Sequence, residues 1–186
     1  LAGGAPIRLH VFGGSQGARY FSDAVPPALA ALPAEISQRL QVVQQAREED
    51  VVRVKAALKD AGIEADVAPF FKDLPQRMAQ SHLVIARAGA SSVAELAAIG
   101  RPSILVPLPH SLDSDQLENA TNLAESGASW CIEQKVLSPD RLAREIERLI
   151  SSQGVLASAA GAAKGQGRPD AVRLLADLVE ELTLKS

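Results

Sequence analysis

Short apolar runs alternate with longer amphipathic stretches along most of the chain. The runs are rich in Val, Ile and Leu, which is typical of strands buried in a parallel sheet. The predicted strands are Ile7–Phe12, Leu40–Gln44, Ala65–Ala68, Leu83–Arg87, Ser103–Pro107 and Ser129–Ile132. The stretches between them place apolar residues three and four positions apart, which predicts helices. The predicted helices are Ala18–Leu32, Glu48–Ala61, Leu74–Gln80, Ser91–Ile99, Asp115–Glu125 and Pro139–Ser151.

This alternation predicts a fold of the α/β class built from βαβ units. Right-handed crossovers would give a Rossmann-like, doubly wound, six-stranded parallel sheet with helices on both faces. Helix boundaries support the assignment, because Ser138-Pro139-Asp140 has the composition of a helix start. Gly62, Gly100 and Gly127 each follow a helical stretch, as C-terminal glycines do.

The pattern divides the chain into four segments. A short linker (1–6) precedes the Rossmann-like domain (7–152), which is followed by a connection rich in Gly and Ala (153–168) and an amphipathic C-terminal helix (169–186). Within this connection we expect the Ala- and Gly-rich segment around Ala159–Gly165 to be mobile. The chain starts at Leu1 without Met, so we expect it to be part of a longer polypeptide.

Composition and charge narrow the class of protein. A net charge of -3 over 186 residues gives no basic field, which argues against a nucleic-acid partner or an anionic membrane surface. The single cysteine, Cys131, lies in an apolar stretch and is interpreted as a structural residue. No apolar run approaches the ~20 residues that cross a bilayer, and no leader-like segment precedes the first strand, so we expect a soluble, cytoplasmic chain.

Glycines follow the first predicted strand in the run Gly13-Gly14-Ser15-Gln16-Gly17. They make either a tight turn or a site where backbone amides approach a phosphate. The Gly-Lys-Ser/Thr ending of a Walker loop is absent.

A second glycine turn follows the fourth predicted strand. Gly89 and Ala90 have no large side chain, so an oxyanion can approach the amides of Ser91 and Ser92, while Glu95 lies one turn further on, within reach of ribose hydroxyls. The alternative is a capping box, with Ser92 as the N-cap and Glu95 bonded back to its amide.

Two more polar segments follow predicted strands. The segment 69–75 contains Phe70 and Phe71, and its backbone can pair with the edge of a planar base or simply carry two core aromatics. The segment 110–120 contains acidic and amide side chains. They can either bind sugar hydroxyls or form a solvated helix start. All four segments fall at the strand ends where open α/β sheets bind ligands.

Taken together, these motifs resemble the C-terminal half of the MurG family of bacterial glycosyltransferases, which transfer GlcNAc from UDP-GlcNAc to lipid I and so form lipid II in peptidoglycan synthesis. The similarity runs from Ile7 to Leu149. It rests on Gly13-Gly14-Ser15-Gln16-Gly17-Ala18, Phe70-Phe71-Lys72-Asp73-Leu74, Arg87-Ala88-Gly89-Ala90, Glu95-Leu96, Gly100-Arg101-Pro102, and Val106-Pro107 through Gln116 to Asn119-Ala120.

The resemblance implies the donor-binding half of a GT-B glycosyltransferase. Phe71 would hold uracil through its backbone, Glu95 the ribose, and Ser15 with the turn at Ala90–Ser92 the diphosphate. Asp115 stands where most relatives are expected to carry His or Gln. The donor-binding residues implied are Gly14, Ser15, Gln16, Phe71, Arg87, Gly89, Ala90, Ser91, Ser92, Glu95, Asp115, Gln116 and Asn119.

The implied reaction is an inverting transfer that needs neither a cofactor nor a metal. The implied partners are UDP-GlcNAc and, through an N-terminal domain that this chain lacks, lipid I and the cytoplasmic face of the inner membrane. That missing domain is also expected to supply the catalytic base, so this chain is expected to bind donor with little turnover.

Three alternatives remain from the sequence. One is another GT-B enzyme, such as a different UDP-sugar transferase or a UDP-GlcNAc epimerase. Another is a non-catalytic nucleotide-sugar-binding subunit. The third is an NAD-binding Rossmann domain. Two features argue against it: the first turn lacks the G-x-G-x-x-G spacing, and no acidic residue ends the second predicted strand.

Overall fold

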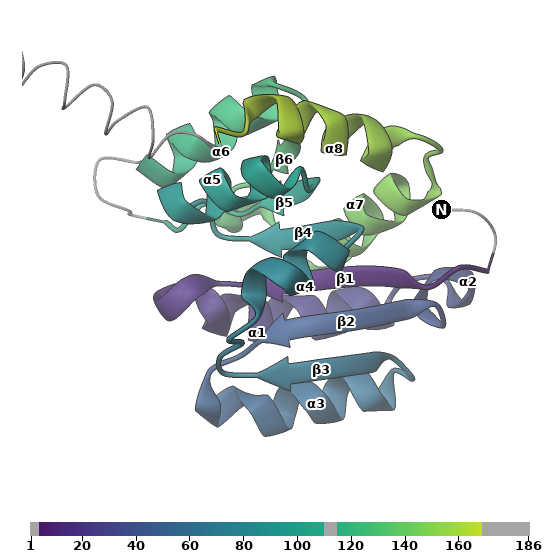
Figure 1. The fold of residues 1–186 in the computed structure, drawn as a ribbon. Helices are drawn as coiled ribbons and strands as arrows, with labels where there is room; N and C mark the ends of the chain where they lie inside the picture. Colours follow the sequence, from purple (N-terminus) through teal and green to yellow (C-terminus); the bar gives the residue numbers. More distant parts are fainter. Residues whose placement is uncertain (1–3, 110–114, 169–186) are drawn as a thin grey trace, which may run out of the picture.

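The computed structural model describes residues 4–109 and 115–168, and within helix α1 it leaves out the side chains of residues 15–18. Six parallel strands form one sheet in the order β3-β2-β1-β4-β5-β6 (Figure 1). Their bounds are Ile7–Phe12 (β1), Leu40–Gln45 (β2), Glu64–Ala68 (β3), Leu83–Ala86 (β4), Ser103–Leu105 (β5) and Ser129–Cys131 (β6). The predicted α/β class and all six predicted strands are confirmed, with ends that shift by at most two residues.

Helices connect successive strands as the amphipathic pattern predicts. They are Gly14–Ala30 (α1), Ala34–Ser37 (α2), Val51–Asp60 (α3), Leu74–Gln80 (α4), Ala90–Ile99 (α5), Asp115–Glu125 (α6), Pro139–Ser151 (α7) and Val155–Gln166 (α8). Two 3₁₀ turns, Glu48–Asp50 and Gln134–Val136, precede α3 and α7. The expected cap of α7 is present, because the Ser138 hydroxyl accepts a 3.2 Å hydrogen bond from the Arg141 amide.

The sheet divides the core into two hydrophobic clusters. On one face α1, α3 and α7 cover Leu9, Val11 and Ile85, and on the other α4, α5 and α6 cover Phe12 and Val84. In Figure 1, α4 and α5 lie in front of the sheet and α1 lies behind it. Alternate residues of one strand therefore enter different clusters, as the two-residue period of a strand requires.

The segment expected to be a mobile connection is helical. Residues 155–166 form α8, which packs along α5 (Figure 1). A Cβ on Gly167 would lie 2.8 Å from the Ala97 carbonyl oxygen, and one on Gly100 would lie 3.1 Å from Lys164 Cβ. The small residues thus allow two helices to approach closely, and this packing outweighs the weak helix propensity of Gly. The expected helix at 169–186 lies outside the described residues.

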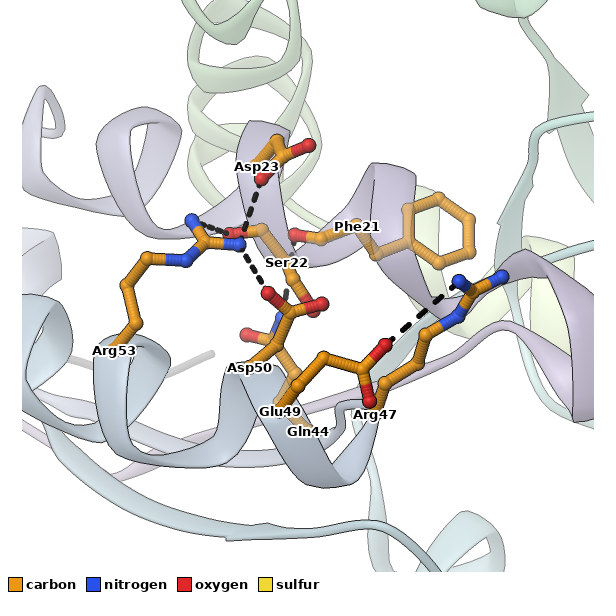
Figure 2. Close-up of polar contacts among 8 residues, drawn as sticks. All are labelled: Phe21, Ser22, Asp23, Gln44, Arg47, Glu49, Asp50 and Arg53. Atoms are coloured by element: carbon orange, nitrogen blue, oxygen red, sulfur yellow. Dashed lines mark hydrogen bonds and ion pairs between the residues drawn. The ribbon is translucent and has the colours of Figure 1, made fainter.

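Polar side chains join α1 to β2 and α3 on one face of the sheet (Figure 2). Arg53 Nη2 donates to Asp23 Oδ1 at 2.8 Å and to Asp50 Oδ1 at 2.7 Å. The buried Gln44 amide donates to the Phe21 carbonyl at 3.2 Å. These bonds fix α1, the helix that begins at the first glycine turn.

His10 lies fully buried in the middle of β1. Its ring meets Phe12 and Phe71 edge to face, with centroid separations of 5.8 and 6.2 Å. Both ring nitrogens lack a hydrogen-bond partner within the described residues. Burial lowers the pKa of His10 to about 4. The positive charge of Arg77 adds a smaller decrease, and the negative charge of Asp73 opposes it.

We expect His10 to make the fold sensitive to mild acid. In the unfolded chain its pKa is about 6.5, so between pH 6.5 and 4 the unfolded state binds more protons, and stability falls as the pH falls. Between pH 7 and pH 5 the free energy of unfolding is expected to fall by roughly 2 kcal/mol. Urea unfolding at both pH values measures it, and His10→Leu is expected to lose that part of the pH dependence. An equal pH dependence in both proteins would contradict the prediction.

Within the described ranges, the structure contains no helix with both the length and the apolar composition that a bilayer crossing requires.

Candidate functional site

The predicted site loops meet at the carboxyl edge of the sheet. β1 and β4 are neighbours in the sheet, yet α1 leaves β1 toward one face and α5 leaves β4 toward the other. The strand order therefore reverses between β1 and β4, and open α/β sheets have their ligand crevice at such a switch point. α1 and α5 begin at this switch point.

The N-terminus of α5 presents unpaired backbone amides. Gly89 is the N-cap, no side chain caps the helix, and the first helical bond runs from Val93 N to Gly89 O at 3.0 Å. The amides of residues 90–92 thus have no intrahelical acceptor. The capping box interpretation is wrong, because Ser92 lies inside the first turn and caps nothing. Glu95 is exposed on the second turn.

The glycine turn after β1 leads directly into α1. Gly13 is the N-cap without a side-chain hydrogen bond, and Gly14 has a φ of +66°, a left-handed conformation that favours glycine. Ser15 and Gln16 belong to the first turn of α1, but their side chains lie outside the described residues. Gln45 at the end of β2 accepts a 3.2 Å bond from the Gly13 amide and donates to Pro69 O at 3.1 Å.

The two phenylalanines after β3 have opposite environments. Phe70 is 71% exposed, whereas Phe71 is 8% exposed and packs its ring between His10 and Arg77. The inward side chain of Phe71 anchors the segment, so the interpretation as two core aromatics is confirmed for Phe71 and wrong for Phe70. The inward packing of the Phe71 side chain is compatible with a role of its backbone at the sheet edge.

Residues of α6 connect this helix to the neighbouring loops. Gln116 Oε1 accepts from Leu108 N at 3.0 Å, and Asn119 Nδ2 donates to Ala88 O at 3.1 Å. Asp115 is exposed and accepts a 2.7 Å bond from the Gln116 amide at the helix start. The polar start of α6 is thereby held beside the start of α5. Residues 110–114, which complete the predicted sugar-binding segment, lie outside the described residues.

Arg87 differs from its expected role as a donor contact. It is 5% exposed, and its guanidinium donates to Val106 O at 3.0 Å, Pro107 O at 3.1 Å and Gln134 Oε1 at 2.6 Å. Burial lowers the pKa of Arg87 to about 10, so it remains charged at neutral pH. With its donors turned into the protein, Arg87 fixes the loop after β5.

Three residues that support the site were not identified from the sequence. Gln45 joins the loops after β1 and β3, Gln134 pairs with Arg87, and Arg77 stacks on Phe71 at 4.5 Å from the ring centroid. The sequence offered a signal for Gln45 alone, which is a glutamine at the end of a strand that lies beside a glycine turn.

The chemistry of this edge suits an extended polar anion. The two helix N-termini carry partial positive charge, which favours a diphosphate, and the Glu95 carboxylate can accept hydrogen bonds from hydroxyls. A groove of about 430 Å³ lies on the face of β1–β3, toward the amino-terminal half of these strands, and is lined by charged residues that include Asp66 and Arg77. No cluster of three or more potential metal ligands occurs in residues 4–109 and 115–168.

Comparison with known families gives one match over most of the chain. Residues 8–175 match the glycosyltransferase family 28 C-terminal domain. A UDP-N-acetylglucosamine--N-acetylmuramyl-(pentapeptide) pyrophosphoryl-undecaprenol N-acetylglucosamine transferase from Methylobacterium nodulans is 54% identical over 187 residues, covering 100% of this chain and 50% of that protein. The transferase of the same name from Brucella canis is 52% identical over 95% of this chain and 46% of its own length. The chain thus spans about half the length of the curated relatives it matches.

Solved structures show the same fold. MurG of Acinetobacter baumannii superimposes with a TM-score of 0.85 at 30% identity, covering 95% of this chain and 52% of that one. WaaG, a glycosyltransferase involved in lipopolysaccharide biosynthesis, matches with a TM-score of 0.67 at 17% identity over 87% of this chain and 42% of its own. This second likeness concerns the fold alone.

Proposed function

Because this chain belongs to the glycosyltransferase family 28 C-terminal domain family, we propose that it is the UDP-GlcNAc-binding half of an inverting N-acetylglucosaminyltransferase that converts lipid I to lipid II. The observation that carries the proposal is the switch point between β1 and β4, where α1 and α5 begin without side-chain caps. Such paired N-termini offer a ready site for a diphosphate.

The proposed donor lies along the carboxyl edge of the sheet. The Phe71 backbone holds uracil, Glu95 the ribose hydroxyls, and the turns at Gly14–Gln16 and Gly89–Ser92 the diphosphate. Asp115, Gln116 and Asn119 lie toward the GlcNAc. We assign Arg87 a positioning role, because its hydrogen bonds hold the backbone of Val106 and Pro107 directly after β5.

In the proposed reaction an acceptor hydroxyl attacks the anomeric carbon and the bond to UDP breaks. Negative charge grows on the leaving diphosphate, and the fixed amides of α1 and α5 stabilise it more in the transition state than in the ground state. An N-terminal domain of the whole protein supplies the base, the lipid I site and peripheral attachment to the cytoplasmic face of the inner membrane. This chain alone therefore binds donor with little transfer.

Calorimetric titration of the chain with UDP-GlcNAc, UDP-glucose and UDP-galactose tests the proposal. We expect saturable binding of all three through their common UDP, with UDP-GlcNAc about tenfold tighter than its competitors because the sugar contacts discriminate. NADH serves as the control ligand and is expected not to bind. Absence of UDP-GlcNAc binding, or a preference for NADH, would overturn the proposed function.

A further inference from the structure

Arg77, on α4, makes contacts with three parts of the segment that surrounds Phe71. Its Nε donates to Asp73 Oδ1 at 2.8 Å, and its Nη1 donates to Asp66 Oδ2 at 2.7 Å. Its guanidinium carbon lies 4.5 Å from the centre of the Phe71 ring. One planar group therefore links strand β3, the loop after it and helix α4.

The Phe71 side chain is enclosed on several sides. The His10 ring meets it at a centroid distance of 6.2 Å, and the Arg77 guanidinium lies over its face. On the other side of the loop, Gln45 Nε2 donates to Pro69 O at 3.1 Å. The backbone at 69–73 is thus fixed from both ends and by its central side chain.

We propose, building on the proposed donor site, that Arg77 is a positioning residue that gives the Phe71 backbone its selectivity for uracil. Uracil presents a donor at N3 and an acceptor at O4, whereas cytosine presents an acceptor at N3 and a donor at its amino group. The backbone N–H and C=O of one residue, held in one orientation, satisfy only one of these patterns, because the other base would leave buried polar groups unpaired. A backbone free to reorient would accept both.

The contacts of Arg77 are better suited to orienting the Phe71 backbone than to stabilising the fold. The side chains of Asp66 and Asp73 are 55% and 53% exposed, and ion pairs so accessible to water contribute little to folding. The planar guanidinium, however, can hydrogen-bond at its edge while stacking on a ring, which a lysine cannot do at the same time. Loss of Arg77 should therefore affect base recognition more than folding.

Arg53 provides a matched control for this test. It also pairs with two carboxylates, at 2.8 and 2.7 Å (Figure 2), but it belongs to α3, which packs on the opposite face of the sheet from α4. Arg53→Met removes the same number of ion pairs as Arg77→Met. Neither Arg53 nor its partners Asp23 and Asp50 belong to the proposed donor site.

The experiment measures the dissociation constants of UDP and CDP by calorimetry for the wild type and for Arg77→Met, Arg77→Lys and Arg53→Met. We expect Arg77→Met to weaken UDP binding and to lower the ratio of UDP to CDP affinity by about tenfold, close to 1.4 kcal/mol. Arg77→Lys, which keeps the charge, should recover part of the ratio, and Arg53→Met should leave it unchanged.

An unchanged ratio in a folded Arg77→Met protein would overturn the positioning role alone, since UDP would still bind. Failure of the wild type to bind UDP would overturn the proposed function as well. If Arg77→Met does not fold, Asp73→Ala takes its place, because alanine has no acceptor for Arg77 Nε and so removes the 2.8 Å contact. The same fall in the ratio is expected for it, and an unchanged ratio would again overturn the role.

Discussion

Replacing Glu95 by alanine is expected to weaken UDP-GlcNAc binding on the order of 100-fold. A carboxylate that accepts hydrogen bonds from two ribose hydroxyls makes charge-assisted bonds, each worth about 1.5–3 kcal/mol, and 100-fold corresponds to about 2.7 kcal/mol. Calorimetric titration of the wild type and the variant measures the change. Thermal unfolding should shift little, because Glu95 is exposed, caps no helix and is replaced by a good helix former.

Two controls separate a ribose contact from a general loss of charge. Glu125→Ala removes another exposed carboxylate, at the far end of α6, and should leave donor affinity unchanged. Pyrophosphate has no ribose, so its affinity should be the same for wild type and Glu95→Ala. Equal UDP-GlcNAc affinity in the two proteins would show that Glu95 contacts no ribose.

Arg87→Met is expected to produce the largest loss of stability among the site variants, about 3 kcal/mol or more. The substitution leaves the carbonyls of Val106 and Pro107 and the Gln134 side chain without their donor, and each buried unpaired group costs about 1–3 kcal/mol. The guanidinium also lies 5.0 Å from the centre of the Phe21 ring, so a favourable stacking contact disappears. Urea unfolding at neutral pH measures the change.

Arg101→Met is the matched control for this variant. The Arg101 side chain donates to Ser81 O at 3.0 Å, and the residue precedes β5 at the amino edge of the sheet. We expect a smaller loss of stability and unchanged donor affinity. If Arg87→Met instead kept its stability and lost donor affinity, Arg87 would be a direct ligand of the donor, as the resemblance implied.

The glycine turns show how far local sequence predicts a site. Glycine after a strand indicates that the backbone must turn tightly or come close to a ligand, and both turns lie at the edge where this was expected. The choice between a capping box and an open helix start was not decided by the sequence, because Ser92 and Glu95 fit both. The N-cap of α5 is Gly89, three residues before the position that the capping box requires, so Ser92 is an interior residue.

The sequence by itself determined the six strands, the helices between them and the edge that carries the site. Apolar periodicity specifies each element locally, and parallel connections are almost always right-handed. The same periodicity is weak in an Ala- and Gly-rich stretch, which is why α8 was expected to be a mobile connection.

Only the tertiary structure decided which side chains turn inward. Arg87 meets Gln134, 47 residues away, and Gln45 meets Gly13, 32 residues away. Contacts at such separations follow no repeat along the chain, since they depend on how whole strands and helices pack. For the same reason the structure alone revealed the contact of Arg77 with Phe71, a core aromatic whose backbone lies at the sheet edge.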